Sequence, residues 1–151
     1  MCMIFALGSC SGAHFNPAVT VAIICADCGK CSVSDGADYI AVQIAGGICA
    51  ACTFMFMEKG QAFGLGPQGK YNMVQACTAE FVFTFVLCFV ALCVATTKAG
   101  LSEFFGLAIG MCVTVGGYAI GGVSGGSLNP AVAIGVSTSF MLCFVVLNVA
   151  C

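Results

Sequence analysis

SGAHFNPAV, at residues 11–19, returns in the second half of the chain as SGGSLNPAV, at residues 124–132. Ser, Gly, Asn, Pro, Ala and Val stand at matching places in the two copies, and both copies lie in very apolar surroundings. Lipid holds no water for bare backbone groups, so an irregular Gly/Ser segment at membrane depth must line a cavity or be buried in protein. Two related copies therefore predict two half-helices that meet at one site, as repeats do in membrane transport proteins.

The composition indicates a membrane protein. Hydrophobic residues make up 61% of the 151 residues and charged residues only 7%, whereas about 25% of the residues of a soluble domain are charged. The formal net charge of −2 argues against a nucleic-acid partner, which requires a basic face. The chain begins in an apolar run without the charged segment of a cleavable signal peptide.

We expect a single all-α membrane domain over residues 1–151, with spans of about 20 residues each. In chain order the predicted elements are the tail of a span (1–8), a turn with a half-helix (9–25), three full spans (39–57, 72–97 and 103–121), a second turn with a half-helix (122–139) and the start of a last span (140–151). An odd number of crossings separates the two motifs, so the second motif enters from the opposite face. This order predicts an inverted repeat.

Each Asn-Pro-Ala (Asn16-Pro17-Ala18 and Asn129-Pro130-Ala131) is placed at the start of a helix. Pro fits the first helical position, the next backbone N–H groups point out of the helix end, and that end carries partial positive charge. Asn is also a favoured N-cap, so capping is the plain structural reading. Two such ends facing one point would repel cations, while the uncharged Asn amides could donate hydrogen bonds to a neutral molecule.

The segments before each Asn-Pro-Ala are predicted to run extended, with carbonyl groups facing a passage. Rows of carbonyls replace the hydration of a passing solute. His14 has three readings: a residue that lines the passage, a pH-sensitive latch or, the reading we favour, a structural hydrogen-bonding group of the turn. The predicted ladder consists of Gly12, Ala13, His14, Gly125, Gly126 and Ser127.

Two polar side chains within the predicted spans are expected to brace the turns. A carboxylate inside a span marks a functional site by default, but for Glu80 we favour a structural role as acceptor for backbone groups of residues 122–128. Gln43 is expected to brace in a similar way.

The sequence predicts neither an enzyme nor a cofactor or metal site. No nucleophile with a base, carboxylate pair or phosphate loop is recognisable. Most of the 13 cysteines lie in apolar runs, where Cys behaves as a small hydrophobe. Cys28 and Cys31 form a C-x-x-C, which we attribute to the cysteine-rich composition, because a metal site would need a second pair of ligands.

The chain resembles the aquaporin (major intrinsic protein) family. The resemblance rests on residues 11–20, on Ala79-Glu80-Phe81 and on the second Asn-Pro-Ala at 129–131. It implies a multi-pass integral membrane protein of the plasma or an intracellular membrane, a homotetramer in the lipid bilayer, and a passive channel for water that excludes ions and protons. The family has six spans, so the resemblance implies an incomplete bundle, a fragment that lacks the first span and most of the second.

The resemblance also implies a selectivity filter that differs from the family's pattern. Val132 stands where Arg typically follows the second Asn-Pro-Ala, and Gly117 and Gly126 stand at two further filter positions. A wider, uncharged filter would admit small neutral solutes such as glycerol or urea. Ala133 stands where glycerol-conducting members carry Asp, which favours water instead.

Two other classes of function remain open. One is a non-conducting or structural membrane subunit, a truncated channel, which the missing spans favour. The other is an ion channel or secondary transporter, for which Glu80 gives little support, since coupled transport needs several titratable groups in the spans.

Overall fold

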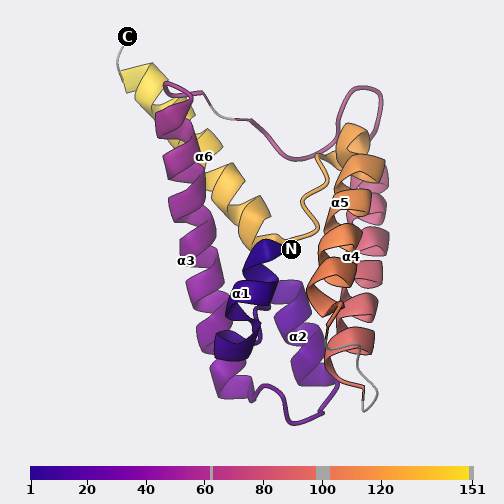
Figure 1. The fold of residues 1–151 in the computed structure, drawn as a ribbon. Helices are drawn as coiled ribbons and strands as arrows, with labels where there is room; N and C mark the ends of the chain where they lie inside the picture. Colours follow the sequence, from indigo (N-terminus) through magenta and orange to yellow (C-terminus); the bar gives the residue numbers. More distant parts are fainter. Residues whose placement is uncertain (62, 98–102, 150–151) are drawn as a thin grey trace.

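All of the regular secondary structure in the described residues is α-helical. The computed structural model describes residues 1–61, 63–97 and 103–149, and no strand occurs among them. The helices (Figure 1) are α1 (Cys2–Ser11), α2 (Pro17–Cys25), α3 (Val33–Met57), α4 (Met73–Ala95), α5 (Phe105–Ser124) and α6 (Pro130–Val149). The predicted all-α class is confirmed.

Three of the helices, α3, α4 and α5, are long and apolar enough to cross a membrane. They have 25, 23 and 20 residues, and about 20 residues span the hydrocarbon core of a bilayer. One face of α4 carries Phe81, Phe85 and Phe89, all of them exposed. A row of exposed phenyl rings on a spanning helix is suited to contact with lipid.

The repeat of the sequence is also a repeat of backbone conformation. Gly12 ends α1 and Gly125 ends α5, both in the left-handed region. The next residue, Ala13 or Gly126, also has a positive φ, and so does the residue before each Asn: φ is 52° at Phe15 and 47° at Leu128. Non-glycine residues rarely adopt this region. The two turns therefore follow the same unusual path, which is what an inverted repeat of one structural unit requires.

The two half-helices differ in how they end. Helix α2 stops at Cys25, and Asp27 and Gly29 follow it at positive φ. We expected a matching half-helix to end near residue 139 and a separate span to begin at 140, but α6 runs without a break from Pro130 to Val149. No Gly or Pro stands between residues 136 and 149, so nothing in this stretch ends the helix.

The other bounds also shift from those predicted. Helix α1 reaches Ser11, inside the predicted turn, because Gly12 is its C-cap. Helix α3 begins at Val33, well before the predicted residue 39, because the Ser32 side chain caps it by accepting a hydrogen bond from the Asp35 N–H. A polar first turn with a good N-cap is favourable, so the charged stretch before residue 39 is partly helical and not all loop.

Small residues set how the helices pack. Helices α3 and α6 cross at Gly47 and Gly135, where a Cβ added to Gly135 would lie 2.3 Å from the Gly47 carbonyl oxygen. Backbones can approach this closely only without side chains between them. Gly106 and Gly110 of α5 form a G-x-x-x-G and lie against Phe5 and Met1 at the start of the chain.

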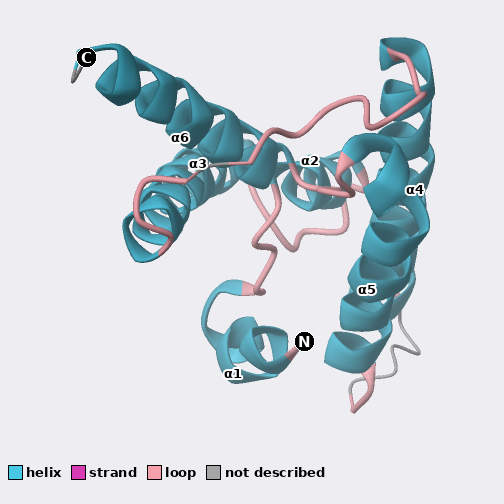
Figure 2. Cartoon of the chain, turned by 90° about the horizontal axis from the view of Figure 1, so that it is seen from above, coloured by secondary structure: helices cyan, strands magenta, loops and turns pink. Residues whose placement is uncertain are grey.

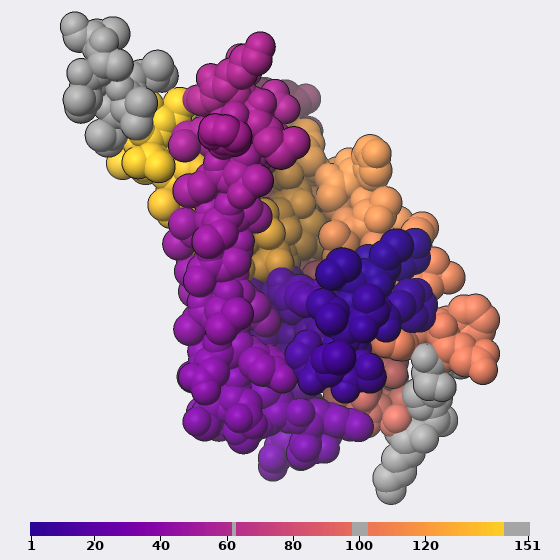
Figure 3. All heavy atoms as spheres, turned by 60° about the vertical axis from the view of Figure 1, so that its left-hand side comes forward, coloured from indigo at the N-terminus to yellow at the C-terminus, as the bar shows by residue number. Residues whose placement is uncertain are grey.

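Seen from above, α2 lies between the α3–α6 pair and the α4–α5 pair (Figure 2). A buried apolar cluster joins α2, α4, α5 and the second turn. It consists of Val19, Ile23, Leu87, Ala91, Ile120 and Leu128. In a space-filling view from one side, α1 lies at the surface between α3 and α5 (Figure 3). The cluster thus fixes the first half-helix against the second turn, which positions the site described next.

Candidate functional site

Asn16 and Asn129 cap the two helices that begin at Pro17 and Pro130. The Asn16 Oδ1 accepts a hydrogen bond from the Ala18 N–H at 2.9 Å, and the Asn129 Oδ1 accepts one from the Ala131 N–H at 3.0 Å. Both bonds satisfy helix N–H groups that have no partner within the helix. Capping therefore accounts for the Oδ1 oxygen of each Asn side chain but not for its amide NH₂ group.

The other half of each Asn reaches across to the opposite repeat. The Asn16 Nδ2 donates to the Leu128 carbonyl oxygen at 2.8 Å, and the Asn129 Nδ2 donates to the Phe15 carbonyl oxygen at 2.9 Å. These reciprocal bonds hold the two helix starts at one place, from which α2 and α6 run apart (Figure 1). Two N-terminal dipole ends therefore face a single region and give it partial positive charge. Each side-chain amide keeps a second N–H for another acceptor.

A cavity of about 230 Å³ lies at this meeting point. Asn16 and Asn129 line it together with His14, Ser127 and hydrophobic side chains from five helices and the two turns. Its hydrophobic lining is made up of Ile4, Phe15, Val19, Leu87, Ile109, Val113, Leu128 and Val132. Such a space offers few polar groups beside the two amides. A small neutral molecule with a hydrogen-bond acceptor matches this arrangement, whereas a cation would meet the positive helix ends.

Glu80 holds the second turn. Its Oε1 accepts hydrogen bonds from the Ser124 hydroxyl at 2.6 Å and the Ser127 N–H at 3.0 Å. Its Oε2 accepts from the Leu128 N–H at 2.8 Å and the Ser127 hydroxyl at 3.4 Å. An ionised carboxylate only accepts hydrogen bonds and has about four acceptor sites, so this turn occupies Glu80 fully. The carboxylate fixes the backbone directly before Asn129.

A different network holds the first turn. The Thr20 hydroxyl is fully buried and donates to the Asn16 carbonyl oxygen at 3.1 Å. It also lies 3.2 Å from the His14 Nδ1 and accepts from the Gln43 Nε2 at 3.0 Å. The His14 ring packs edge-on against Tyr39, with ring centroids 5.3 Å apart. His14 thus lines the central cavity and also takes part in the network of the first turn.

Sequence reasoning missed Thr20. Thr20 directly follows Asn-Pro-Ala-Val in the first copy, whereas the second copy has Ala133 at the matching place. This difference between the two copies is the sequence signal that could have pointed to Thr20. The Gln43 Oε1 is buried and has no hydrogen-bond partner within the described residues.

The predicted carbonyl ladder divides between two environments. Gly12, Ala13 and His14 line a cavity of about 410 Å³ on the first-repeat side. In the second repeat, Ser127 lines the central cavity, whereas Gly125 lies against Leu65. Each turn contains an equivalent internal hydrogen bond. The Ala13 N–H donates to the Ser11 hydroxyl in the first turn, and the Gly126 N–H donates to the Ser124 hydroxyl in the second.

Of the three predicted filter positions, the structure brings two into contact. A Cβ added to Gly126 would lie 2.7 Å from the Gly117 carbonyl oxygen, so only glycine fits there. Val132 lies apart from this pair and lines two cavities, the central one and a second of about 220 Å³ between α3 and α6. All three positions are uncharged, so none of them supplies a cationic side chain.

No group of three His, Cys, Asp or Glu side chains suited to a metal ion occurs in the described ranges. Cys28 of the C-x-x-C is exposed and Cys31 is half-buried, and both are free thiols.

Comparison with known proteins identifies the family of the chain. A family model described as "Major intrinsic protein" matches residues 1–145. The chain belongs to the major intrinsic protein family. The predicted family and the predicted multi-pass integral membrane character are both confirmed, and members of this family are channels and not enzymes.

Several plant proteins are similar to the chain. Aquaporin NIP1-3 of Oryza sativa subsp. japonica is 40% identical over 138 residues, which cover 89% of this chain and 47% of that protein. Aquaporin NIP1-2 of Arabidopsis thaliana is 36% identical over 148 residues, which cover 89% of this chain and 48% of that protein. A putative aquaporin NIP4-1 of Arabidopsis thaliana is 38% identical over 137 residues. The chain spans about half the length of these relatives.

Proposed function

We propose that the protein is a passive transmembrane channel for water and small neutral solutes, and that it excludes ions and protons. The observation that carries the proposal is the pair of reciprocal bonds from Asn16 to the Leu128 carbonyl and from Asn129 to the Phe15 carbonyl. They hold two helix N-termini and two amide donors at one cavity. Membership of a channel family supports the same function, as do relatives named aquaporins.

Exclusion of cations follows from the electrostatics of the helix ends. Each N-terminus carries roughly half a positive elementary charge, and the site has no carboxylate among its lining residues to offset it. A water molecule can present its oxygen to the Asn amides, whereas a hydrated cation loses hydration and gains repulsion.

The solute range depends on the uncharged filter. With Val132, Gly117 and Gly126 at the filter positions, selection would rest on width and not on charge, and glycerol or urea could accompany water. Val132→Arg should tighten the filter and add a positive charge. We expect it to lower glycerol flux more than water flux in proteoliposomes.

The first test is the flux of the protein reconstituted in liposomes. Light scattering after an osmotic step should give water permeability well above that of empty liposomes, with no ion current across planar bilayers. Water flux without glycerol or urea flux would restrict the channel to water. Ion current would instead favour an ion channel.

The second test asks whether Asn129 does more than cap a helix. Asp caps helices as well as Asn, so Asn129→Asp keeps the cap but replaces the amide donor with a negative charge. We expect cation or proton leakage. Asn72 caps α4 outside the site, with the same side-chain bond to a backbone N–H, so Asn72→Asp is the matched control and should leave flux unchanged. Equal behaviour of the two variants would contradict the proposed role of Asn129.

A non-conducting or structural membrane subunit is the alternative. It is favoured by the first turn, which has no carboxylate partner within the described residues although the second turn has Glu80. Wild-type protein that is folded in liposomes and adds no flux would establish this alternative.

The family resemblance further supports a homotetramer in the bilayer with one passage per subunit, which the mass of the detergent-solubilised particle would test.

A further inference from the structure

The connection between α3 and α4 lies across the second turn. The Gly66 N–H donates to the Ser124 carbonyl oxygen at 2.9 Å and the Gln68 N–H donates to the Val123 carbonyl oxygen at 3.0 Å. Leu65 lies against Gly125, where an added Cβ would be 2.5 Å from the Leu65 Cδ2. In Figure 1 this connection passes from the end of α3 to the start of α4, over the end of α5. It is therefore attached to the backbone that leads into the second Asn-Pro-Ala.

Phe63, in this connection, forms an aromatic pair with Phe54 of α3. The ring centroids are 5.4 Å apart and the planes are nearly perpendicular, at 89°. Edge-to-face pairs of this kind are favourable beyond the area they bury. The pair thus gives Phe63 a defined place although its own ring is 49% exposed.

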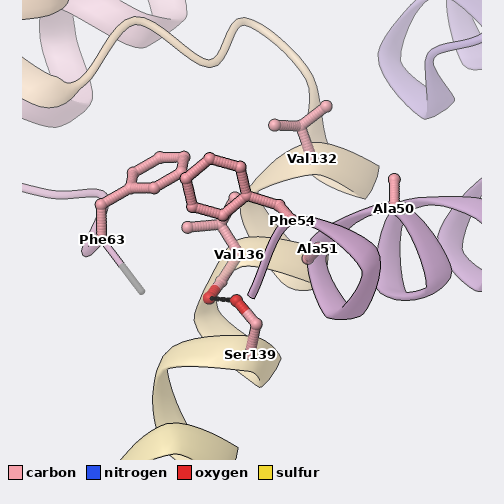
Figure 4. A pocket seen from close by; sticks show the side chains of 8 residues that line it. Ala50, Ala51, Phe54, Phe63, Val132, Val136 and Ser139 are labelled. Atoms are coloured by element: carbon pink, nitrogen blue, oxygen red, sulfur yellow. Dashed lines mark hydrogen bonds between the residues drawn. The ribbon is translucent and has the colours of Figure 1, made fainter. Parts of the chain in front are cut away.

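The aromatic pair and Val132 line the same cavity of about 220 Å³ (Figure 4). Its remaining walls come from small residues of α3 and from Val136 and Ser139 of α6. The Ser139 hydroxyl donates to the Val136 carbonyl oxygen, so it offers little to a solute. The cavity is an apolar space whose largest side chains are the two phenyl rings.

Val132 lies between this space and the central one, because it lines both cavities. We propose that Phe63, supported by Phe54, is a specificity-determining residue that limits the size of neutral solutes beyond Val132. This inference rests on the proposed channel function. Where a constriction carries no charge, its width and its apolar lining decide what passes, and the rings of Phe54 and Phe63 are the bulkiest side chains that line the cavity beyond Val132.

The experiment compares Phe63→Ala and Phe63→Trp with wild-type protein in liposomes, using water, urea, glycerol and the larger polyol xylitol as probes. Phe63→Ala should raise the ratio of glycerol to water permeability by about tenfold, the lower end of what a change of pocket size is worth. Xylitol should gain more than glycerol. Phe63→Trp should lower both ratios.

Phe56→Ala is the matched control, since Phe56 stands near Phe54 on α3 but is 87% exposed and lines neither cavity. A structural role for Phe63 would lower all fluxes together and leave the ratios unchanged. The inference is overturned while the channel function stands if wild-type protein conducts and the Phe63 variants shift the ratios no more than Phe56→Ala. Wild-type protein without water flux overturns both. Phe63→Trp keeps the test decisive if Phe63→Ala does not fold.

Discussion

The turn before Asn129 and the turn before Asn16 follow the same left-handed path and exchange the same amide bonds, but different side chains hold them. Glu80 binds the second turn through two main-chain N–H groups and two hydroxyls. Thr20, His14 and Gln43 hold the first turn through one shared hydroxyl. Leu128 of the second turn is 1% exposed, whereas Phe15 of the first is 42% exposed.

The difference shows that one backbone shape can be stabilised by charge or by neutral hydrogen bonds. A carboxylate bonded to several N–H groups is the stronger device, because bonds to an ionised group are about twice as strong as neutral ones. We therefore expect the second turn to be the more rigid of the two and the more sensitive to loss of its support.

Replacing Glu80 should have the largest effect. In Glu80→Ala the Ser127 and Leu128 N–H groups lose their acceptor, and each buried donor left unpaired costs about 1–3 kcal/mol. We expect a loss of about 3 kcal/mol in the free energy of unfolding, followed in detergent by thermal or denaturant unfolding, together with lost water flux. Glu58→Ala, at an exposed site, is the control. A Glu80→Ala protein as stable as this control would contradict the bracing role.

Replacing Thr20 should have an intermediate effect. Thr20→Val keeps the shape but removes the hydroxyl that connects His14, Gln43 and the Asn16 carbonyl. We expect a loss of about 2 kcal/mol, since a buried hydrogen-bonded group loses its partners. Thr20→Ser keeps the hydroxyl and should lose less. The exposed Thr53, whose hydroxyl bonds only the Cys49 carbonyl, supplies the control Thr53→Val. If Thr20→Ser and Thr20→Val were equally unstable, the hydroxyl would not be the stabilising group.

Replacing Gln43 should have the smallest effect. Gln43→Met removes the bond to Thr20 but also removes a buried Oε1 that has no partner among the described residues. The two changes oppose each other, so we expect a net loss below about 1 kcal/mol. The same unfolding measurement checks it. A loss as large as that of Thr20→Val would mean that Gln43, and not Thr20, is the centre of the network.

Structural features that depend on neighbouring residues in the chain could be predicted from the sequence. The two helix starts could be predicted because Asn-Pro caps a helix and fixes its first turn, and a carboxylate in an apolar span needs donors nearby. The carbonyls that receive the Asn amides, those of Phe15 and Leu128, could not be predicted. Every residue has a carbonyl, and only the meeting of the repeats selects these two.

Three features required the folded chain. Helix α6 is continuous because no helix-ending residue follows Ser139. The first repeat, whose half-helix ends at Cys25, had suggested a break there. The crossing at Gly47 and Gly135 joins glycines far apart in sequence, and nothing in the local sequence around either glycine pairs it with the other. The position of Phe63 follows from the hydrogen bonds that attach the α3–α4 connection to α5. The local sequence around Phe63 does not predict these bonds.

The exchanged amide bonds also constrain the order in which the chain assembles. Asn16 and Leu128 are 112 residues apart, and Asn129 and Phe15 are 114 apart. The first turn leaves the ribosome long before its partner exists, so its amide and carbonyl must remain solvated or be protected until the second half arrives. Contacts of such long sequence separation form late. We therefore expect the two helix starts to meet late in assembly, after both repeats have been synthesised.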